Sequence, residues 1–215
     1  MIAFSGLDGA GKSTQISLLT DFYKTKKIKT QMFWSRGGYT PGMECVKSLL
    51  RRFNNSTIPK ERGLSSKRDD SFSNGFIRKA WLTLAILDLI YYYAIYIRFK
   101  EFFGTVIICD RYLFDTLLDF KRNFPQENVN RWLIWRLLMR VSTNPKKHFI
   151  LTISVIESQY RSTLKDEPFP DSKETLKFRL DEYLKYGYNN KFVVEINCEK
   201  SIELIHQQII TYLKK

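Results

Sequence analysis

Cysteine is scarce in this sequence, and nothing at its start is typical of a leader. The 215 residues include three cysteines, Cys45, Cys109 and Cys198, an odd number without metal-ligand spacing. This argues against a disulfide scaffold and a structural zinc site. Met1 runs straight into the apolar Ile2–Ser5 with no basic region and no small-residue cleavage site. We therefore expect no signal peptide and a cytoplasmic location.

Acidic residues are also in short supply. Lys and Arg number 35 against 22 Asp and Glu, which gives a net charge of +13. Such an excess favours an anionic partner, such as a nucleotide, a nucleic acid or an acidic membrane surface. No nucleic-acid-binding motif accompanies the charge. We expect small-molecule nucleotides as partners and not nucleic acid, while peripheral membrane contact stays open.

One long apolar run requires a choice between membrane and core. Residues 80–97 read AWLTLAILDLIYYYAIYI, with Asp88 as their single charge. This is near the lower limit for a helix that spans a bilayer. The central acid, the tyrosine hydroxyls and the polar sequence on both sides instead favour a helix buried on nearly all its faces.

Short apolar runs alternate with helical patterns along the chain. Strands are expected at 2–5, 30–34, 105–109, 148–154 and 192–196, and helices after Lys12 and at 80–97, 113–122, 127–141, 157–165, 173–186 and 201–213. The alternation predicts an α/β fold, with one domain over 1–215, a parallel five-stranded sheet and helices on both faces. The polar stretch 54–75 is expected to be a flexible insertion.

The most specific motif lies between the first strand and the first helix. Residues 6–13 read GLDGAGKS and satisfy G-x-x-x-x-G-K-[ST], the phosphate loop of the P-loop NTPase fold. Lys12 would reach the β- and γ-phosphates of ATP, and the Ser13 hydroxyl would ligate Mg²⁺. The residues expected to bind ATP are Gly6, Asp8, Gly9, Ala10, Gly11, Lys12, Ser13 and Thr14.

A second pair of polar residues follows the third strand. Asp110 and Arg111 come directly after the β-branched run 105–109. In open α/β sheets ligands bind beyond the carboxyl ends of the strands. An acid at this place suits a Mg²⁺-organising carboxylate, and the arginine beside it suits a phosphate.

FSGLDGAGKSTQ at 4–15, together with DRY at 110–112, resembles the thymidylate kinases, a branch of the nucleoside monophosphate kinases. The likeness follows the chain in order: the phosphate loop, an Arg-Gly-Gly loop after the second strand, DRY after the third, and a lid after the fourth. It implies Mg²⁺-dependent transfer of a phosphoryl group from ATP to a nucleoside monophosphate, with dTMP to dTDP as the first expectation. Thymidylate kinases are often dimers, so the resemblance also admits a homodimer.

The resemblance implies a role for each matching residue. Asp8 would meet the sugar hydroxyl of the acceptor, and Arg36 would bind the acceptor phosphate. Asp110 would organise Mg²⁺, and Arg111 would hold the phosphate undergoing transfer. Arg161, in the expected lid at 157–173, would neutralise charge on the transferring group. The expected catalytic residues are thus Lys12, Asp110, Arg111 and Arg161.

The sequence departs from the family pattern at two informative places. Ser5 stands before the phosphate-loop glycine, where the family commonly has Glu, and Leu89 stands where the family has an arginine that reads the base. A site that loses a base-reading group can change its substrate. Two alternatives therefore stay open: the same fold acting on a sugar- or lipid-linked acceptor, and a P-loop NTPase associated with nucleic acid or membrane.

Overall fold

A parallel sheet forms the centre of the molecule. The computed structural model describes residues 1–35, 72–165 and 171–214. The strands are β1 (Ile2–Gly6), β2 (Thr30–Trp34), β3 (Val106–Asp110), β4 (Lys147–Thr152) and β5 (Val193–Asn197). They lie in the order β2-β3-β1-β4-β5, and every neighbouring pair is parallel. The prediction of an α/β fold with a parallel five-stranded sheet is confirmed.

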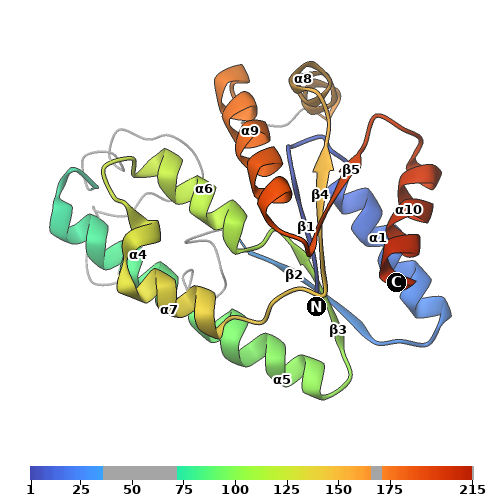
Figure 1. Ribbon diagram of the computed structural model, residues 1–215, viewed down its shortest axis with the longest axis horizontal. Helices are drawn as coiled ribbons and strands as arrows, with labels where there is room; N and C mark the ends of the chain where they lie inside the picture. Colours follow the sequence, from blue (N-terminus) through green and yellow to red (C-terminus); the bar gives the residue numbers. More distant parts are fainter. Residues whose placement is uncertain (36–71, 166–170, 215) are drawn as a thin grey trace.

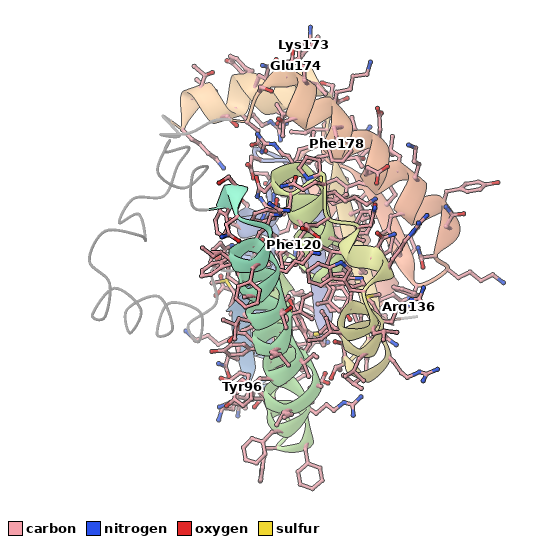
Figure 2. The ribbon with its side chains drawn as sticks, turned by 90° about the vertical axis from the view of Figure 1, so that its left-hand side faces the viewer. Tyr96, Phe120, Arg136, Lys173, Glu174 and Phe178 are labelled. Carbon is pink, nitrogen blue, oxygen red and sulfur yellow. The ribbon has the colours of Figure 1, made fainter. Side chains whose placement is uncertain are left out.

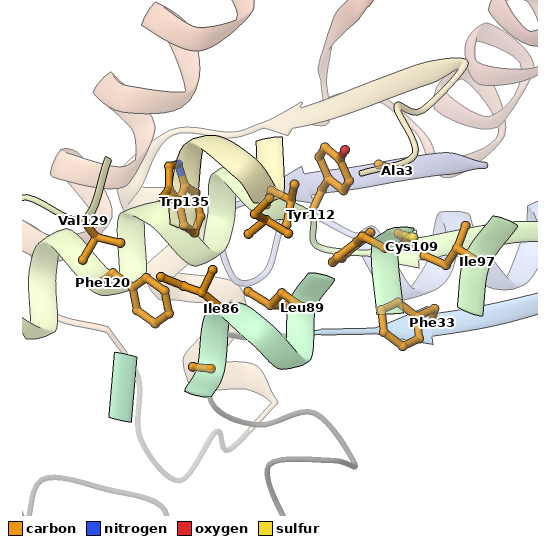
Figure 3. Close-up of a cluster of buried hydrophobic side chains, with 14 of the residues drawn as sticks. Ala3, Phe33, Ile86, Leu89, Ile97, Cys109, Tyr112, Phe120, Val129 and Trp135 are labelled. Atoms are coloured by element: carbon orange, nitrogen blue, oxygen red, sulfur yellow. The ribbon is translucent and has the colours of Figure 1, made fainter. Parts of the chain in front are cut away.

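Helices cover both faces of this sheet (Figure 1). The helices are α1 (Lys12–Thr25), α4 (Gly75–Ile90), α5 (Ile97–Phe102), α6 (Leu113–Asn123), α7 (Leu133–Val141), α8 (Val155–Leu164), α9 (Lys173–Asn189) and α10 (Ile202–Lys214). Because strand side chains alternate between faces, Ile2 and Phe4 belong to the core that includes Ile16 of α1 and Ile205 of α10. Ala3 belongs to a second core, formed with α4, α5 and α7 (Figure 3).

The helix from α4 to α5 is continuous but contains one wide turn. A π-helical segment, Tyr91–Tyr96, joins the two parts, and Ile97 N donates to Tyr92 O five residues back. A wide turn withdraws a carbonyl from the regular hydrogen-bond ladder. Here both the backbone N and the hydroxyl of Thr143 donate to Tyr93 O, at 3.0 and 2.9 Å.

The prediction that this helix is buried on nearly all faces is wrong. Over its most apolar window only 33% of the residues are buried, although by length and composition the described helix 75–102 could cross a membrane. Its inner face packs on the sheet through Leu89, Tyr93 and Ile97, whereas Leu87 and Ile95 face outward. Apolar residues occur all around the helix, so their periodicity did not reveal which face is covered.

Two helical boundaries also differ from expectation. The helix expected at 127–141 is split into a 3₁₀ turn, Val129–Arg131, and α7, because Trp132 between them has an extended backbone. The helix expected to stop at Gly187 continues to Asn189. A glycine inside a helix costs only about 1 kcal/mol relative to alanine, which packing of the helix can outweigh.

Of the stretch 54–75, only residues 72–75 are described. Phe72 packs against Trp81 and Phe124, with ring centroids 5.9 and 5.2 Å apart. Asn74 caps α4 by accepting from the backbone N of Phe76 at 2.9 Å. The last residues of the expected insertion are therefore attached to the domain core.

Candidate functional site

The loop after β1 can turn tightly because glycine occupies its critical positions. A Cβ on Gly6 would lie 2.3 Å from Leu151 O, closer than any real contact. Gly9 has a φ of +78°, and a Cβ there would press on Ser158 O and on Arg161 Cβ of α8. The loop leads directly into α1, whose N-cap, Gly11, offers no side-chain acceptor. The amino end of this helix therefore suits an anionic ligand.

Lys12, the first residue of α1, folds back over this loop. Its Nζ donates to Gly6 O at 3.0 Å and to Leu7 O at 2.7 Å, and it lies 3.8 Å from Asp8 Oδ1. The pKa of Lys12 is lowered to about 8, chiefly by burial and also by the nearby Arg111, against the opposing effect of Asp8. The ammonium group is thus poorly compensated, which suits a group that receives phosphate charge.

A polar cavity of about 200 Å³ opens at this end of the sheet. It lies beyond the carboxyl ends of β1, β2 and β3, where parallel strands place their following residues together. Its lining residues are Asp8, Gly9, Gly11, Lys12, Ser13, Trp34, Asp110, Arg111 and Lys165. Two segments about a hundred residues apart, the phosphate loop and the end of β3, therefore meet at one cavity.

Asp110 is the acid best placed to hold a cation. Its Oδ1 is buried and has no hydrogen-bond partner within the described part of the chain. Burial raises the pKa of Asp110, while Lys12 and Arg111 oppose this effect. No group of three or more His, Cys, Asp or Glu forms a metal cluster among the described residues. Mg²⁺ typically needs only one or two carboxylates beside phosphates and water, so Asp110 and Ser13 fit such an ion.

Arg111 is held between two carboxylates. Its Nη2 donates to Asp8 Oδ1 at 2.7 Å, and its Nη1 lies 3.7 Å from Asp115 Oδ1. The backbone of Arg111 has a φ of +78°, unusual for a residue other than glycine, and its N donates to Phe4 O at 2.8 Å. This bond to β1 and the two carboxylates fix the guanidinium beside the phosphate loop.

Asp115 organises a buried polar cluster behind Arg111. Its carboxylate accepts from the hydroxyl of Ser5, from Tyr183 OH at 2.6 Å and from Tyr112 N at 2.8 Å. His148 Nε2 lies 2.7 Å from the same Ser5 hydroxyl, and burial lowers the pKa of His148 to about 4 despite the nearby Asp115. The cluster connects β1, β4, α6 and α9 to the arginine at the cavity.

A second buried contact lies under the end of β2. Ser35 Oγ is 2.6 Å from Tyr93 OH, which lies 3.5 Å from Arg111 O. Tyr93 belongs to the π-helical turn, so the irregular part of the long helix contacts the residue that precedes Arg36. Turns of this kind are frequent near functional sites.

The amino-terminal half of the expected lid packs directly on the phosphate loop. Ser158 Oγ donates to Asp8 O at 2.6 Å. The guanidinium of Arg161 contacts Glu157 Oε1 at 2.6 Å and donates to the carbonyl oxygens of Gly9 and Cys198, each at 3.3 Å. Arg161 therefore lies beside the loop without lining the cavity, whereas Lys165, one turn further on, lines it.

The structure brings together most of the residues that the sequence predicted. Asp8, Gly9, Gly11, Lys12, Ser13, Asp110 and Arg111 all line the cavity. The predicted residues that do not line it are Gly6, Ala10, Thr14 and Arg161. Arg36, the expected acceptor-phosphate ligand, lies outside the described residues, as does residue range 166–170 of the expected lid.

Sequence reasoning missed Trp34, Lys165 and Asp115 as parts of this site. Trp34 ends β2 next to β3, so the rule that located Asp110 could also have located Trp34. Asp115 stands four residues after Arg111, a spacing at which side chains meet at the start of a helix. No comparable signal in the sequence distinguishes Lys165 from Arg161.

The position of Leu89 bears on the missing base-reading arginine. Leu89 is 0% exposed and lies in the core with Ile86, Cys109 and Phe120 (Figure 3). Its side chain belongs to the helix face that packs on the sheet. An aliphatic side chain fits this environment, whereas a charged one would lose its hydration there.

The comparison with known proteins gives one relative along the whole chain. No protein-family model matches the chain. A protein of Methanocaldococcus jannaschii described as a probable thymidylate kinase is 27% identical over 213 residues. These residues make up 99% of this chain and 95% of that protein. The likeness thus extends from the phosphate loop through the carboxyl-terminal helix.

Proposed function

We propose that this chain is a kinase of the thymidylate kinase type, which its 27% identity to a probable thymidylate kinase over 99% of its length supports. It would transfer the γ-phosphoryl group of ATP to the phosphate of a nucleoside monophosphate, with dTMP as the leading acceptor. One observation carries the proposal: Lys12, Asp8, Asp110 and Arg111 converge on one polar cavity at the phosphate loop. Lys12 and Arg111 are both buried, and they line this cavity together with Asp8 and Asp110. This pattern suits a site for a charged phosphate chain and a metal ion.

The residues at the cavity divide the work between binding and charge neutralisation. The loop and Lys12 would bind the ATP phosphates, with Lys12 exchanging its bonds to Gly6 O and Leu7 O for bonds to phosphate oxygens. Ser13 and Asp110 would hold Mg²⁺, which neutralises phosphate charge when bound. Arg111 would orient the phosphate that is transferred, while Asp8 restrains its guanidinium.

The attacking group needs little acid–base help. The second pKa of a phosphate monoester is about 6, so an acceptor phosphate is mostly a dianion at neutral pH and attacks without losing a proton. Positioning and neutralisation then remain as the protein's tasks. We propose that α8 and Lys165 shield one side of the cavity from water. Ser158 and Arg161 hold α8 against the phosphate loop, and Lys165 lines the cavity.

The same chemistry on a different acceptor is the second candidate. Leu89 is buried in the core, so that position offers no arginine to a base, and Trp34 adds an aromatic surface to the cavity. A sugar- or lipid-linked phosphate is therefore a reasonable alternative acceptor.

The test measures ADP release from Mg-ATP with dTMP, dUMP, dCMP, dGMP, dAMP, UMP and no acceptor. Selective stimulation by dTMP supports thymidylate kinase activity, and Lys12→Ala should abolish it. ATP binding without stimulation by any nucleotide would contradict nucleotide phosphorylation and direct the screen to sugar- and lipid-linked phosphates. Turnover that requires DNA or RNA would contradict both candidates.

A further inference from the structure

An exposed aromatic cluster marks the end of the molecule opposite the cavity. The long helix ends at Phe102, and Phe99, Phe102 and Phe103 are 59%, 84% and 64% exposed. Their rings contact one another, with centroids 4.8 Å apart for Phe99 and Phe103 and 5.4 Å for Phe102 and Phe103. Single exposed apolar residues are ordinary, but a contiguous group of three phenylalanines indicates a contact surface.

Basic residues are frequent in the segments at this end of the sheet. Thr105 N donates to Lys100 O and Val106 N to Lys29 O, which brings the loop after α1 next to the loop after α5. Lys146 N donates to Met1 O, and the carboxylate of Glu101 is paired with the amino terminus. We call the following set the basic-aromatic end, because its members lie at the end of α5 or in the segments that lead into the strands: Phe99, Phe102, Phe103, Lys27, Lys29, Lys100, Lys146, Lys147 and Lys191.

The basic-aromatic end lies where the parallel strands begin. Lys29 precedes β2, Lys147 opens β4 and Lys191 comes shortly before β5, whereas the cavity lies where β1 and β3 end. Figure 2 shows Tyr96 of the long helix far from Lys173 and Glu174, which open α9 at the other end. A surface bound at the basic-aromatic end therefore leaves the cavity open.

We propose that the basic-aromatic end docks the protein on an anionic lipid bilayer, with the phenylalanines in the interfacial region and the lysines against lipid phosphates. Stable attachment of a peripheral protein takes two signals, and an apolar group beside a polybasic patch supplies both. A second copy of the chain fits less well, because a symmetric contact would bring the same positive charges together. Nucleic acid accounts for the charge but leaves the apolar cluster in water.

The test is cosedimentation of the full chain with vesicles of phosphatidylcholine alone and of phosphatidylcholine with phosphatidylserine. We expect binding only to the anionic vesicles, with affinity that falls as salt is raised. Phe102→Ser with Phe103→Ser should weaken binding at least about tenfold, because two apolar side chains lose their interfacial contact. Lys27→Gln with Lys29→Gln should weaken it by about fivefold for each charge.

The long helix provides a matched control at its other end. Phe76 is 81% exposed at the start of α4, so Phe76→Ser changes the same residue type without touching the basic-aromatic end. Vesicle affinity should be unchanged in this variant, and all the variants should retain their thermal stability and ATP binding. In Phe102→Trp, added fluorescence should shift to the blue with anionic vesicles, which reports insertion directly.

Several outcomes would overturn the proposal. Equal binding to neutral and anionic vesicles, or no binding to either, would contradict it. So would a loss of affinity in Phe76→Ser as large as that in the Phe102→Ser, Phe103→Ser double variant. A fluorescence spectrum of Phe102→Trp that does not change with anionic vesicles would also contradict it. A change of oligomeric state in the phenylalanine variant without vesicle binding would assign the surface to a second copy. Binding to DNA or RNA but not to vesicles would assign it to nucleic acid. None of these results depends on which acceptor is phosphorylated.

Discussion

Asp115→Asn tests how Arg111 is held, since it removes a charge from the buried cluster while keeping the side chain's size. The Asp115 carboxylate is 1% exposed and accepts from Tyr112 N and Tyr183 OH, with Arg111 Nη1 at 3.7 Å. Asparagine retains one oxygen for the fixed N–H of Tyr112. Its amide NH₂ then faces Tyr183 and Arg111, where the carboxylate had its second oxygen.

The structure sets the size of the effect on stability. A hydrogen bond to a charged group contributes about 1.5–3 kcal/mol, and the Tyr112 bond survives in a weaker, neutral form. We therefore expect Asp115→Asn to lower the free energy of unfolding by about 2–3 kcal/mol. For a chain of 215 residues this corresponds to a Tm lower by roughly 5–10 °C. Asp115→Ala, which leaves buried donors unpaired, should cost about 3–5 kcal/mol.

Asp119→Asn is the matched control on the same helix. Asp119 is 3% exposed and accepts from Arg179 Nη2 at 2.5 Å, one turn away from Asp115. Its loss should reduce stability by a similar amount and weaken the field at Arg111 slightly, while both carboxylate contacts of Arg111, with Asp8 and Asp115, stay in place. Asp115→Asn should lower kcat/KM for phosphoryl transfer by about tenfold and Asp119→Asn much less, because Asp115→Asn removes one of the two carboxylates that contact Arg111 among the described residues.

Urea unfolding and initial rates at a temperature well below both transitions provide the two readouts. Stability of Asp115→Asn within about 0.5 kcal/mol of the unmodified chain would refute the role of the charge. Equal losses of kcat/KM in Asp115→Asn and Asp119→Asn would refute the link to Arg111. Asp115 would then be a structural residue with no specific effect on the cavity.

Three other predictions concern Lys12, His148 and Leu89. The pKa of Lys12 is lowered to about 8, so about half of the Lys12 side chains are neutral at pH 8. Bound ATP phosphates should restore the charge, and binding should therefore take up about half a proton. Calorimetry in buffers of different ionisation enthalpy measures this uptake, and Lys12→Arg should lose it. The pKa of His148 is lowered from 6.5 to about 4, so on acidification the unfolded chain binds this proton before the folded chain does. About 3 kcal/mol of stability should be lost as the pH falls from 6.5 to 4. Urea unfolding should show a smaller loss of stability with pH in His148→Gln, and an equal loss in this variant would contradict the prediction. Leu89→Arg should lower the free energy of unfolding by at least about 3 kcal/mol, because it places a charge in the core; a stable variant with increased dTMP selectivity in the ADP-release assay would contradict it.

The sheet and most of the cavity were predictable from local patterns. The runs at 2–4 and 106–109 are apolar, short and followed by polar residues or glycine, so their strand character is encoded within a few positions. Once the strands are parallel, their carboxyl ends share one edge of the sheet. For this reason the sequence alone was enough to assign Asp110 to the same place as Lys12.

The buried cluster and the exposed helix face depended on tertiary structure. Ser5 and Asp115 are 110 residues apart, and Asp115 and Tyr183 are 68 apart. No local pattern links residues at such separations. In 80–97 apolar residues surround the helix, so hydrophobicity alone did not separate the face on the sheet from the face in solvent. Arg161 was chosen over Lys165 by residue type, whereas the side-chain direction decides which one lines the cavity.

The π-helical turn at Tyr91–Tyr96 has a consequence for how this fold can diverge. Such a turn amounts to one extra residue in an otherwise regular helix, and one residue corresponds to about 100° of rotation about the helix axis. The turn thus determines the direction in which Phe99 and Phe102 point about the helix axis, while the contact between Ser35 and Tyr93 stays the same. A homologue lacking that residue would align here with a single-position gap. One insertion or deletion in this turn could therefore rotate the phenylalanines of the basic-aromatic end during evolution. The cavity at the phosphate loop would stay the same.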